Sequence, residues 1–189
     1  GDVYKRQLDE RELAAFRQKH LGFVFQSYNL LPNLTALENV AMPLMFQGMP
    51  KNKREAIAKK MLKRVGLGKR MNHYPTQMSG GQQQRVGIAR AFAARPQVVF
   101  ADEPTGNLDS VSSAEVLGFL KRSVNELGQT IVMVTHDAVA ASYADRALVF
   151  ADGQIAADVN KPTADQMSEL LMKEREAATM NVASARHSR

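Results

Sequence analysis

The chain has 189 residues, of which 44% are hydrophobic, and its 25 Lys and Arg residues against 19 Asp and Glu give a formal net charge of +6. This length suffices for one ordinary globular domain with a substantial core. The absence of Cys excludes disulfide scaffolds, thiol nucleophiles and Cys-ligated metal sites, and no apolar run approaches the roughly 18–20 residues of a membrane-spanning helix.

The N-terminal part predicts a helix and a strand, followed by a mostly irregular segment. A capping box and two apolar residues on one helical face predict a short helix over residues 9–19. The apolar run LGFVFQ, residues 21–26, has the length of a strand. Residues 27–50 are rich in Leu, Asn, Met and Pro and predict only one helical stretch, at residues 36–45.

A strongly basic segment follows. Residues 51–70 carry nine basic side chains against the single acid Glu55, with apolar residues at helical spacing on one side. We interpret this segment as a solvated helix that buries a narrow apolar stripe. The alternative, a nucleic-acid-binding patch, is disfavoured because no aromatic residues interleave with the basic ones.

Beyond the basic segment, helices alternate with buried strands. The predicted elements are helices over residues 79–95, 110–127 and from about 137, strands over 98–102 and 130–135, and a hairpin that turns at Asp152-Gly153. Strands separated by helices of this length predict an α/β fold with a largely parallel, helix-covered sheet. Residues 173–189 are polar and rich in Ala and Ser, which predicts a flexible tail.

The sequence Ser79-Gly80-Gly81-Gln82 opens one of these helices. Ser79 can cap the helix while Gln82 bonds back to the cap, and the two glycines let backbone N–H groups approach a ligand. A helix N-terminus presented in this way binds anions. Taken alone, the motif is also explained by a plain capping box with flexible glycines.

Two adjacent carboxylates, Asp102 and Glu103, follow the apolar residues 98–101. Ligands of open parallel sheets bind at the carboxyl ends of the strands. A carboxylate at the last strand position suits Mg²⁺, usually through water. Its neighbour then faces the other way, where it could orient or deprotonate a water for in-line attack. An acidic strand end that merely caps the next loop is the alternative.

Three further candidates lie next to predicted strands or helices. His136 follows the strand at residues 130–135 and could donate to a phosphate oxygen, or be an ordinary hydrogen-bonded loop histidine. Gln26 ends the first strand and is either a water or metal contact or only a strand-end amide. Residues 106–109, Gly-Asn-Leu-Asp, could be a turn and a helix cap with no other role.

These five features occur in the order found in the nucleotide-binding subunits of ATP-binding cassette (ABC) transporters, which the chain resembles from about Leu8 to Asp158. The matched motifs, named as in that family, are the Q-loop at Gln26, the signature motif at 78–82, the Walker B strand at 98–102, the catalytic carboxylate at Glu103, the D-loop at 106–109 and the switch histidine at His136. The stretches FVFQSYNLLPNLTALENV and EPTGNLD, with the triple Gln after the signature, resemble the branch of lipoprotein-releasing, macrolide-export and cell-division ATPases.

The resemblance implies a P-loop NTPase-like sheet with a helical subdomain at about residues 27–79, and ATP bound between two such domains facing head to tail. One chain would supply catalytic Glu103, His136 and Gln26, with Asp102 and Gln26 at Mg²⁺. The facing chain would supply the cofactor-binding residues, which are Ser79, Gly80, Gly81, Gln82 and Asp109.

The chain departs from the family pattern in three places. Met78 stands for the usual Leu, and Gly106 opens the D-loop where many members have Ser. The third departure is larger: no P-loop, G-x-x-x-x-G-K-[ST], occurs, since the only Gly-Lys step is Gly68-Lys69. We therefore expect a partial ABC ATPase domain over residues 8–172 that lacks its first strand and P-loop. Residues 1–7 are expected to be a non-native start.

The resemblance further implies an ATP-hydrolysing subunit that powers export or extraction through a membrane-spanning permease, as a homodimer or beside a homologous subunit. Such a subunit lies in the cytoplasm, held at the inner membrane by its partner. The chain as given is expected to be inactive because it has no P-loop. The alternative is a regulatory ATPase of the cell-division type. A DNA-repair ATPase is disfavoured, because no heptad run separates Gln26 from Ser79.

Overall fold

The computed structural model describes residues 9–187, with their side chains up to residue 176. The predicted non-native start at residues 1–7 therefore lies outside the described residues. The chain divides into two compact units, Gly1–Val134 and Thr135–Arg189.

A three-stranded parallel sheet forms the centre of the first unit. Its strands, in spatial order, are β1 (Leu21–Phe25), β2 (Val98–Asp102) and β3 (Thr130–Val134). The strands agree with the predicted ones to within a residue at each end. Their parallel arrangement confirms the predicted α/β architecture.

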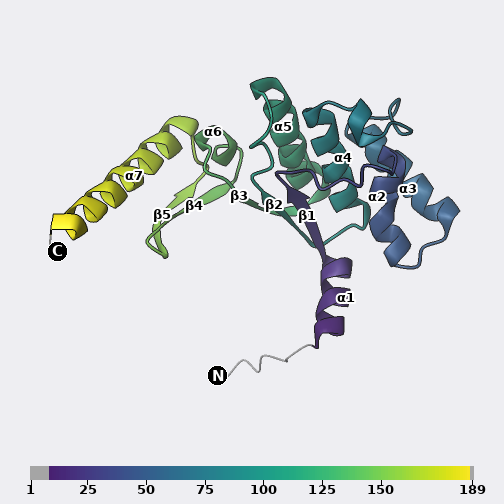
Figure 1. Cartoon of the computed structure of the whole chain (residues 1–189), viewed down its shortest axis with the longest axis horizontal. Coiled ribbons are helices and arrows are strands. Elements are labelled where there is room, and N and C mark those ends of the chain that lie inside the picture. Colours follow the sequence, from purple (N-terminus) through teal and green to yellow (C-terminus); the bar gives the residue numbers. More distant parts are fainter. Residues whose placement is uncertain (1–8, 188–189) are drawn as a thin grey trace. The chain divides into compact units, whose positions relative to one another are not determined.

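Two helices, α4 (Gly80–Ala93) and α5 (Ser110–Leu127), lie along one face of this sheet (Figure 1). Because side chains alternate along a strand, that face buries Val24, Val99 and Ala101. α4 approaches β1 so closely that a Cβ at Gly22 would lie 2.7 Å from the Ala91 carbonyl oxygen, so this position requires glycine.

The opposite face of the sheet is apolar and exposed. It carries Phe23, Phe25, Phe100, Val132 and Val134, each between 37% and 60% exposed. The Phe23 ring stacks against the Phe25 and Phe100 rings, with centroids 6.0 and 5.8 Å apart. Within the described residues of the first unit, helices therefore cover this sheet on one side only.

Two helices between β1 and α4 form a helical layer beside α4 (Figure 1): α2 (Ala36–Phe46) and α3 (Lys51–Arg64). Their shared core includes Leu44, Leu62 and Leu67. The sequence predicts a basic helix reaching toward residue 70, but α3 ends at Arg64. Gly66 then adopts a left-handed φ of 75°, which ends the helix.

The helix α1 (Glu10–His20) precedes β1 and has the predicted capping box between Asp9 and Glu12. None of its residues is buried, and its two apolar side chains, Leu13 and Phe16, are exposed. Local capping therefore accounts for this helix better than packing does.

The second unit contains a short helix, a hairpin and a long helix: α6 (Ala138–Ala141), β4 (Arg146–Ala151), β5 (Gln154–Asn160) and α7 (Ala164–His187). The hairpin turns at Asp152 and Gly153, which have φ values of 48° and 77°. Two consecutive left-handed residues form the tight turn that the Asp-Gly pair predicts. Arg146 donates through Nε and Nη2 to both carboxylate oxygens of Asp158, at 2.8 and 2.6 Å.

The C-terminal segment is helical. The sequence predicts a flexible tail from residue 173, and in the structure α7 continues as helix to His187. The segment is rich in Ala, Arg and Glu, which have high helix propensity. The flexibility of the segment stays a prediction.

Candidate functional site

The carboxyl ends of the three parallel strands meet at one edge of the sheet. Phe25, Asp102 and Val134 lie in register across β1, β2 and β3. The next residues along β1 and β2 are Gln26 and Glu103, and the N–H of Glu103 donates to the Val134 carbonyl at 2.9 Å. The structure thus brings Gln26, Asp102 and Glu103 to the same edge, where parallel sheets bind ligands.

Glu103 has a left-handed backbone, with φ of 44°. A non-glycine residue in this region is strained and is held there by its surroundings. Besides its N–H bond to Val134, the Glu103 carbonyl accepts from the N–H of Gly106 at 3.0 Å. The half-buried Glu103 is therefore fixed at a sharp bend directly after the exposed Asp102.

Gln26 lies against the loop that follows Glu103. Its Nε2 donates to Asn107 Oδ1 at 3.4 Å, and Asn107 Nδ2 donates back to the Gln26 carbonyl at 3.2 Å. A Cβ at Gly106 would lie 2.5 Å from Gln26 Nε2. Serine at position 106, which many family members have, would therefore require the Gln26 side chain to move.

The start of α4 has the predicted capping box. Ser79 Oγ accepts from the Gln82 N–H at 3.3 Å, and Gln82 Oε1 accepts from the Ser79 N–H at 3.2 Å. Ser79 is exposed, whereas Gly81 is buried, and a Cβ there would lie 2.7 Å from Ser112 Oγ of α5. Gly81 thus also serves the packing of α4 against α5. Gly80 lies beside the Tyr28 hydroxyl.

Asp109 caps α5. Its Oδ1 accepts from the Ser112 N–H at 2.9 Å and its Oδ2 from the Ser112 hydroxyl at 2.8 Å. The backbone bond and then the hydroxyl bond lower the pKa of the Asp109 carboxyl below its ordinary value. The expected helix cap is therefore present, and the carboxylate is exposed at the end of the 106–109 loop.

Two residues of α4 that sequence reasoning did not single out hold the loops after β1 and β2. The fully buried Gln84 donates through Nε2 to the Pro104 carbonyl at 2.6 Å. Arg90 Nη2 donates to the Tyr28 carbonyl at 3.0 Å, and its other terminal nitrogen donates to the Asn29 carbonyl. Burial lowers the pKa of Arg90.

Tyr28 and Asn29 have left-handed φ values of 60° and 48°, so Arg90 fixes a strained stretch two residues after Gln26. Long-range bonds of this kind leave little local signal. The only hint in the sequence is a polar or charged residue, Gln84 or Arg90, at a position of α4 that borders its buried face.

His136 belongs to the second unit, whereas Gln26, Asp102 and Glu103 belong to the first. It is exposed and lies between Thr135, whose Oγ1 accepts from the Asp137 N–H at 3.1 Å, and Asp137, which caps α6. The structure places His136 in the segment between β3 and α6, at the start of the second unit.

The described residues contain no cluster of three or more His, Asp or Glu side chains with the spacing of a metal centre. Mg²⁺ commonly keeps several waters and takes only one or two protein ligands. A site made of one carboxylate and one amide, Asp102 and Gln26, needs no such cluster.

A comparison with protein families gives the decisive observation. The family model described as ABC transporter matches residues 2–106, which is more than half of the 189 residues. The chain belongs to the ABC transporter family.

Curated relatives agree with this membership. The chain is 51% identical over 166 residues to the uncharacterized ABC transporter ATP-binding protein MJ1508 of Methanocaldococcus jannaschii, covering 85% of this chain and 74% of that protein. It is 53% identical over 151 residues to the macrolide export ATP-binding/permease protein MacB of Pasteurella multocida, covering 80% of this chain. The match spans only 23% of that MacB protein.

Solved structures of the family share the fold. The dimeric post-hydrolysis state of the ATP-binding cassette MJ0796, bound to ADP and Pi, matches with a TM-score of 0.73 and 43% identity, over 82% of this chain and 68% of that one. A second dimeric MJ0796 cassette matches with a TM-score of 0.74. The ABC ATPase fold is thereby confirmed. None of the helices among the described residues is long and apolar enough to cross a membrane.

Proposed function

We propose that this chain is the ATP-binding and ATP-hydrolysing part of an ABC transporter complex that powers export or extraction through a membrane-spanning permease. The observation that carries the proposal is the meeting of Gln26, Asp102 and Glu103 at one edge of the sheet. The names of the relatives, an ATP-binding protein and a macrolide export ATP-binding/permease protein, support it.

Asp102 and Gln26 would hold Mg²⁺. The Asp102 carboxylate is exposed at the end of β2, and the Gln26 amide follows the neighbouring strand β1. Both offer oxygen ligands, which suit this cation. When bound, Mg²⁺ supplies positive charge to the terminal phosphates of ATP.

Glu103 would orient or deprotonate the attacking water, a role that needs a carboxylate at a fixed position. The bend at Glu103 and its two backbone bonds provide that fixation. His136 would donate to the γ-phosphate from the second unit.

A second chain, identical or homologous, would face the first head to tail. Its Ser79, Gly80, Gly81 and Gln82 would contact the γ-phosphate through the N-terminal end of α4, where free N–H groups and the helix dipole favour an anion. Its Asp109 would couple the two ATP sites. The dimeric state of the MJ0796 cassettes supports this arrangement.

The permease would hold the chain at the cytoplasmic face of the inner membrane. Nucleic acid has no part in this function.

The first experiment is calorimetric titration of ATP–Mg²⁺ into the 189-residue chain and into an extended chain. The extended chain carries, upstream, a first strand and a P-loop taken from a relative. Since the P-loop supplies the backbone cradle and the Lys for the phosphates, we expect binding by the extended chain and little or none by the short one.

The matched control for this titration is an extended chain whose P-loop Lys is replaced by Ala, which should bind as poorly as the short chain. Comparable ATP affinity of the short and extended chains would contradict the assignment. The phosphate contacts would then come from residues other than those named above.

A further inference from the structure

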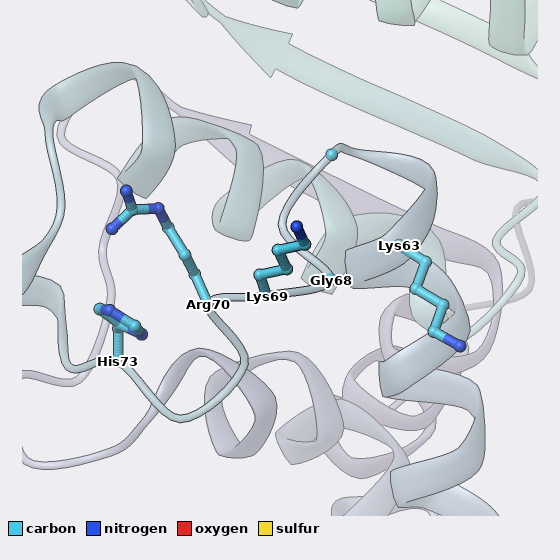
Figure 2. Close-up of a pocket in the computed structure, with 6 residues that line it drawn as sticks. Lys63, Gly68, Lys69, Arg70 and His73 are labelled. Carbon is cyan, nitrogen blue, oxygen red and sulfur yellow. The ribbon is translucent and has the colours of Figure 1, made fainter.

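A pocket with a volume of about 590 Å³ lies beside the C-terminal end of α3 (Figure 2), and none of the residues assigned to ATP lines it. It is lined by Lys63, Gly66, Gly68, Lys69, Arg70 and His73. Every lining side chain belongs to a Lys, an Arg or a His, and the remaining positions are glycines. A pocket of this composition favours an anionic ligand.

The loop that carries these residues is fixed at both ends. At its start, the N–H of Leu67 donates to the Leu62 carbonyl at 2.8 Å, and the Leu67 side chain is buried. At its end, the Met71 and His73 carbonyls accept from the first two N–H groups of α2, each at 2.9 Å. The basic side chains therefore extend from an ordered backbone, which lowers the entropic cost of binding.

Three cationic or titratable side chains extend from this loop: Lys69 and Arg70 are exposed and His73 is half-buried. Figure 2 shows the Lys63 ammonium directed away from these three side chains, so that Lys63 lines the pocket with the aliphatic part of its side chain. Among the described side chains, no carboxylate forms an ion pair with Lys69 or Arg70. The acid nearest in sequence, Glu55, pairs instead with Lys51 at the other end of α3, at 3.8 Å.

The helix dipole explains only part of this charge. Cations in the last turn stabilise the carbonyl end of a helix, which accounts for Lys63 and Arg64. Lys69, Arg70 and His73 come after the helix has ended. In the described part of the chain, the N–H groups of Gly68 and Lys69 also donate to no carbonyl or side-chain acceptor.

We propose that this pocket binds a phosphate group. Proteins bind phosphate oxygens with backbone N–H groups, Lys ammonium groups and planar Arg guanidinium groups. The loop offers all three: the N–H groups of Gly68 and Lys69, the Lys69 ammonium and the Arg70 guanidinium. The lining has no aromatic ring on which a base could stack, which disfavours a nucleic acid. The phosphate could be free inorganic phosphate or the headgroup of an anionic phospholipid. The proposal does not depend on ATP hydrolysis.

The test is an NMR titration of the ¹⁵N-labelled 189-residue chain with inorganic phosphate at constant, low ionic strength. We expect saturable shifts of the Gly68 and Lys69 amide signals. The double substitution Lys69→Gln/Arg70→Gln should weaken binding roughly tenfold or more, the scale of losing charge-assisted hydrogen bonds. The matched control, Lys51→Gln/Lys53→Gln, removes the same charge from the other end of α3 and should bind as the native chain does.

Equal weakening by both double variants would overturn the proposal, because net charge alone would then explain binding. Shifts confined to residues 80–83 at the start of α4, or no saturable shift, would also overturn it.

Vesicles distinguish the two sources of phosphate. A lipid headgroup would be identified if the native chain co-sediments with phosphatidylcholine vesicles that contain phosphatidylglycerol. This co-sedimentation should be lost in Lys69→Gln/Arg70→Gln and absent with vesicles of phosphatidylcholine alone. Saturable shifts without co-sedimentation would identify free phosphate.

Discussion

Glu103 combines a strained backbone with the carboxylate that we propose acts on the attacking water. Its left-handed φ of 44° is maintained by backbone bonds to Val134 and Gly106, so the main chain holds the bend. A change from carboxylate to amide should therefore alter the chemistry while leaving the bend intact.

We expect Glu103→Gln, made in the extended chain, to retain ATP binding and to lower the hydrolysis rate by roughly 10² or more, the usual scale of losing a general base or a water-positioning group. The ATP-bound dimer should accumulate. Steady-state hydrolysis and size-exclusion chromatography with ATP measure both effects. Glu115→Gln, the same change at an exposed residue of α5, is the control. Hydrolysis by Glu103→Gln at the native rate would remove Glu103 from the mechanism.

Gln84 is fully buried and makes only one of the bonds that its amide could make. Nε2 donates to the Pro104 carbonyl, whereas Oε1 is buried without a hydrogen-bond partner among the described residues. Replacing the amide by an apolar group therefore removes one unsatisfied acceptor, but it leaves the buried Pro104 carbonyl without this donor. For Gln84→Met we expect the free energy of unfolding to fall by about 1 kcal/mol.

Gln84→Glu should behave differently because the introduced carboxyl can donate to the Pro104 carbonyl only when it is protonated. Burial raises the pKa of such a group in the folded state. The variant's stability is then highest below the unfolded-state value of about 4.3 and falls as the pH rises. We expect a loss of about 3 kcal/mol at pH 7, relative to the native chain, and a smaller loss at pH 4. Urea unfolding at both pH values measures this, and an equal loss at both would contradict the proposed bond.

At the scale of elements, α2 is joined to the loop before it by one buried side chain. Asn39 Nδ2 donates to the carbonyls of Leu31, Leu34 and Thr35 at 3.0–3.1 Å, and Oδ1 accepts from the Leu31 N–H at 2.8 Å. The loop thus owes its conformation to a residue of the following helix.

We expect Asn39→Leu to lower the free energy of unfolding by about 2–4 kcal/mol, because it leaves several buried backbone groups without partners. Urea denaturation of the 189-residue chain measures this loss. Asn52→Leu, at an exposed position of α3, should stay within about 0.5 kcal/mol of the native chain. A similar small effect at both positions would show that water replaces the Asn39 bonds.

At the scale of the whole molecule, sequence reasoning succeeds where the signal is local. The strands β1 and β2 and the helix α5 are predicted almost residue by residue, because apolar runs, caps and the αL residue Gly128 mark their ends. The order of the motifs predicts the family. The register of β1 with β2 then follows, since parallel strands align their carboxyl ends at a ligand site.

What sequence reasoning misses depends on contacts between distant residues. Arg90 bonds to carbonyls 61 and 62 residues away, and Gln84 to one 20 residues away. Neither contact produces a periodic pattern in the sequence from which it could be predicted. The surroundings of Gly106 are another example: the atom nearest to a Cβ there belongs to the Gln26 side chain, 80 positions earlier in the sequence. The boundary between the two compact units, at Val134 and Thr135, also does not coincide with a change in amino-acid composition.

The exposed aromatic face of the sheet, where the Phe23 ring stacks on the Phe25 and Phe100 rings, makes the first unit partly water-repellent. Salts such as ammonium sulfate are excluded from protein surfaces and so strengthen the drive to remove apolar area from water. The chain will therefore salt out early and adhere to hydrophobic chromatography media. Dilute solutions of low ionic strength are the conditions under which it stays dispersed.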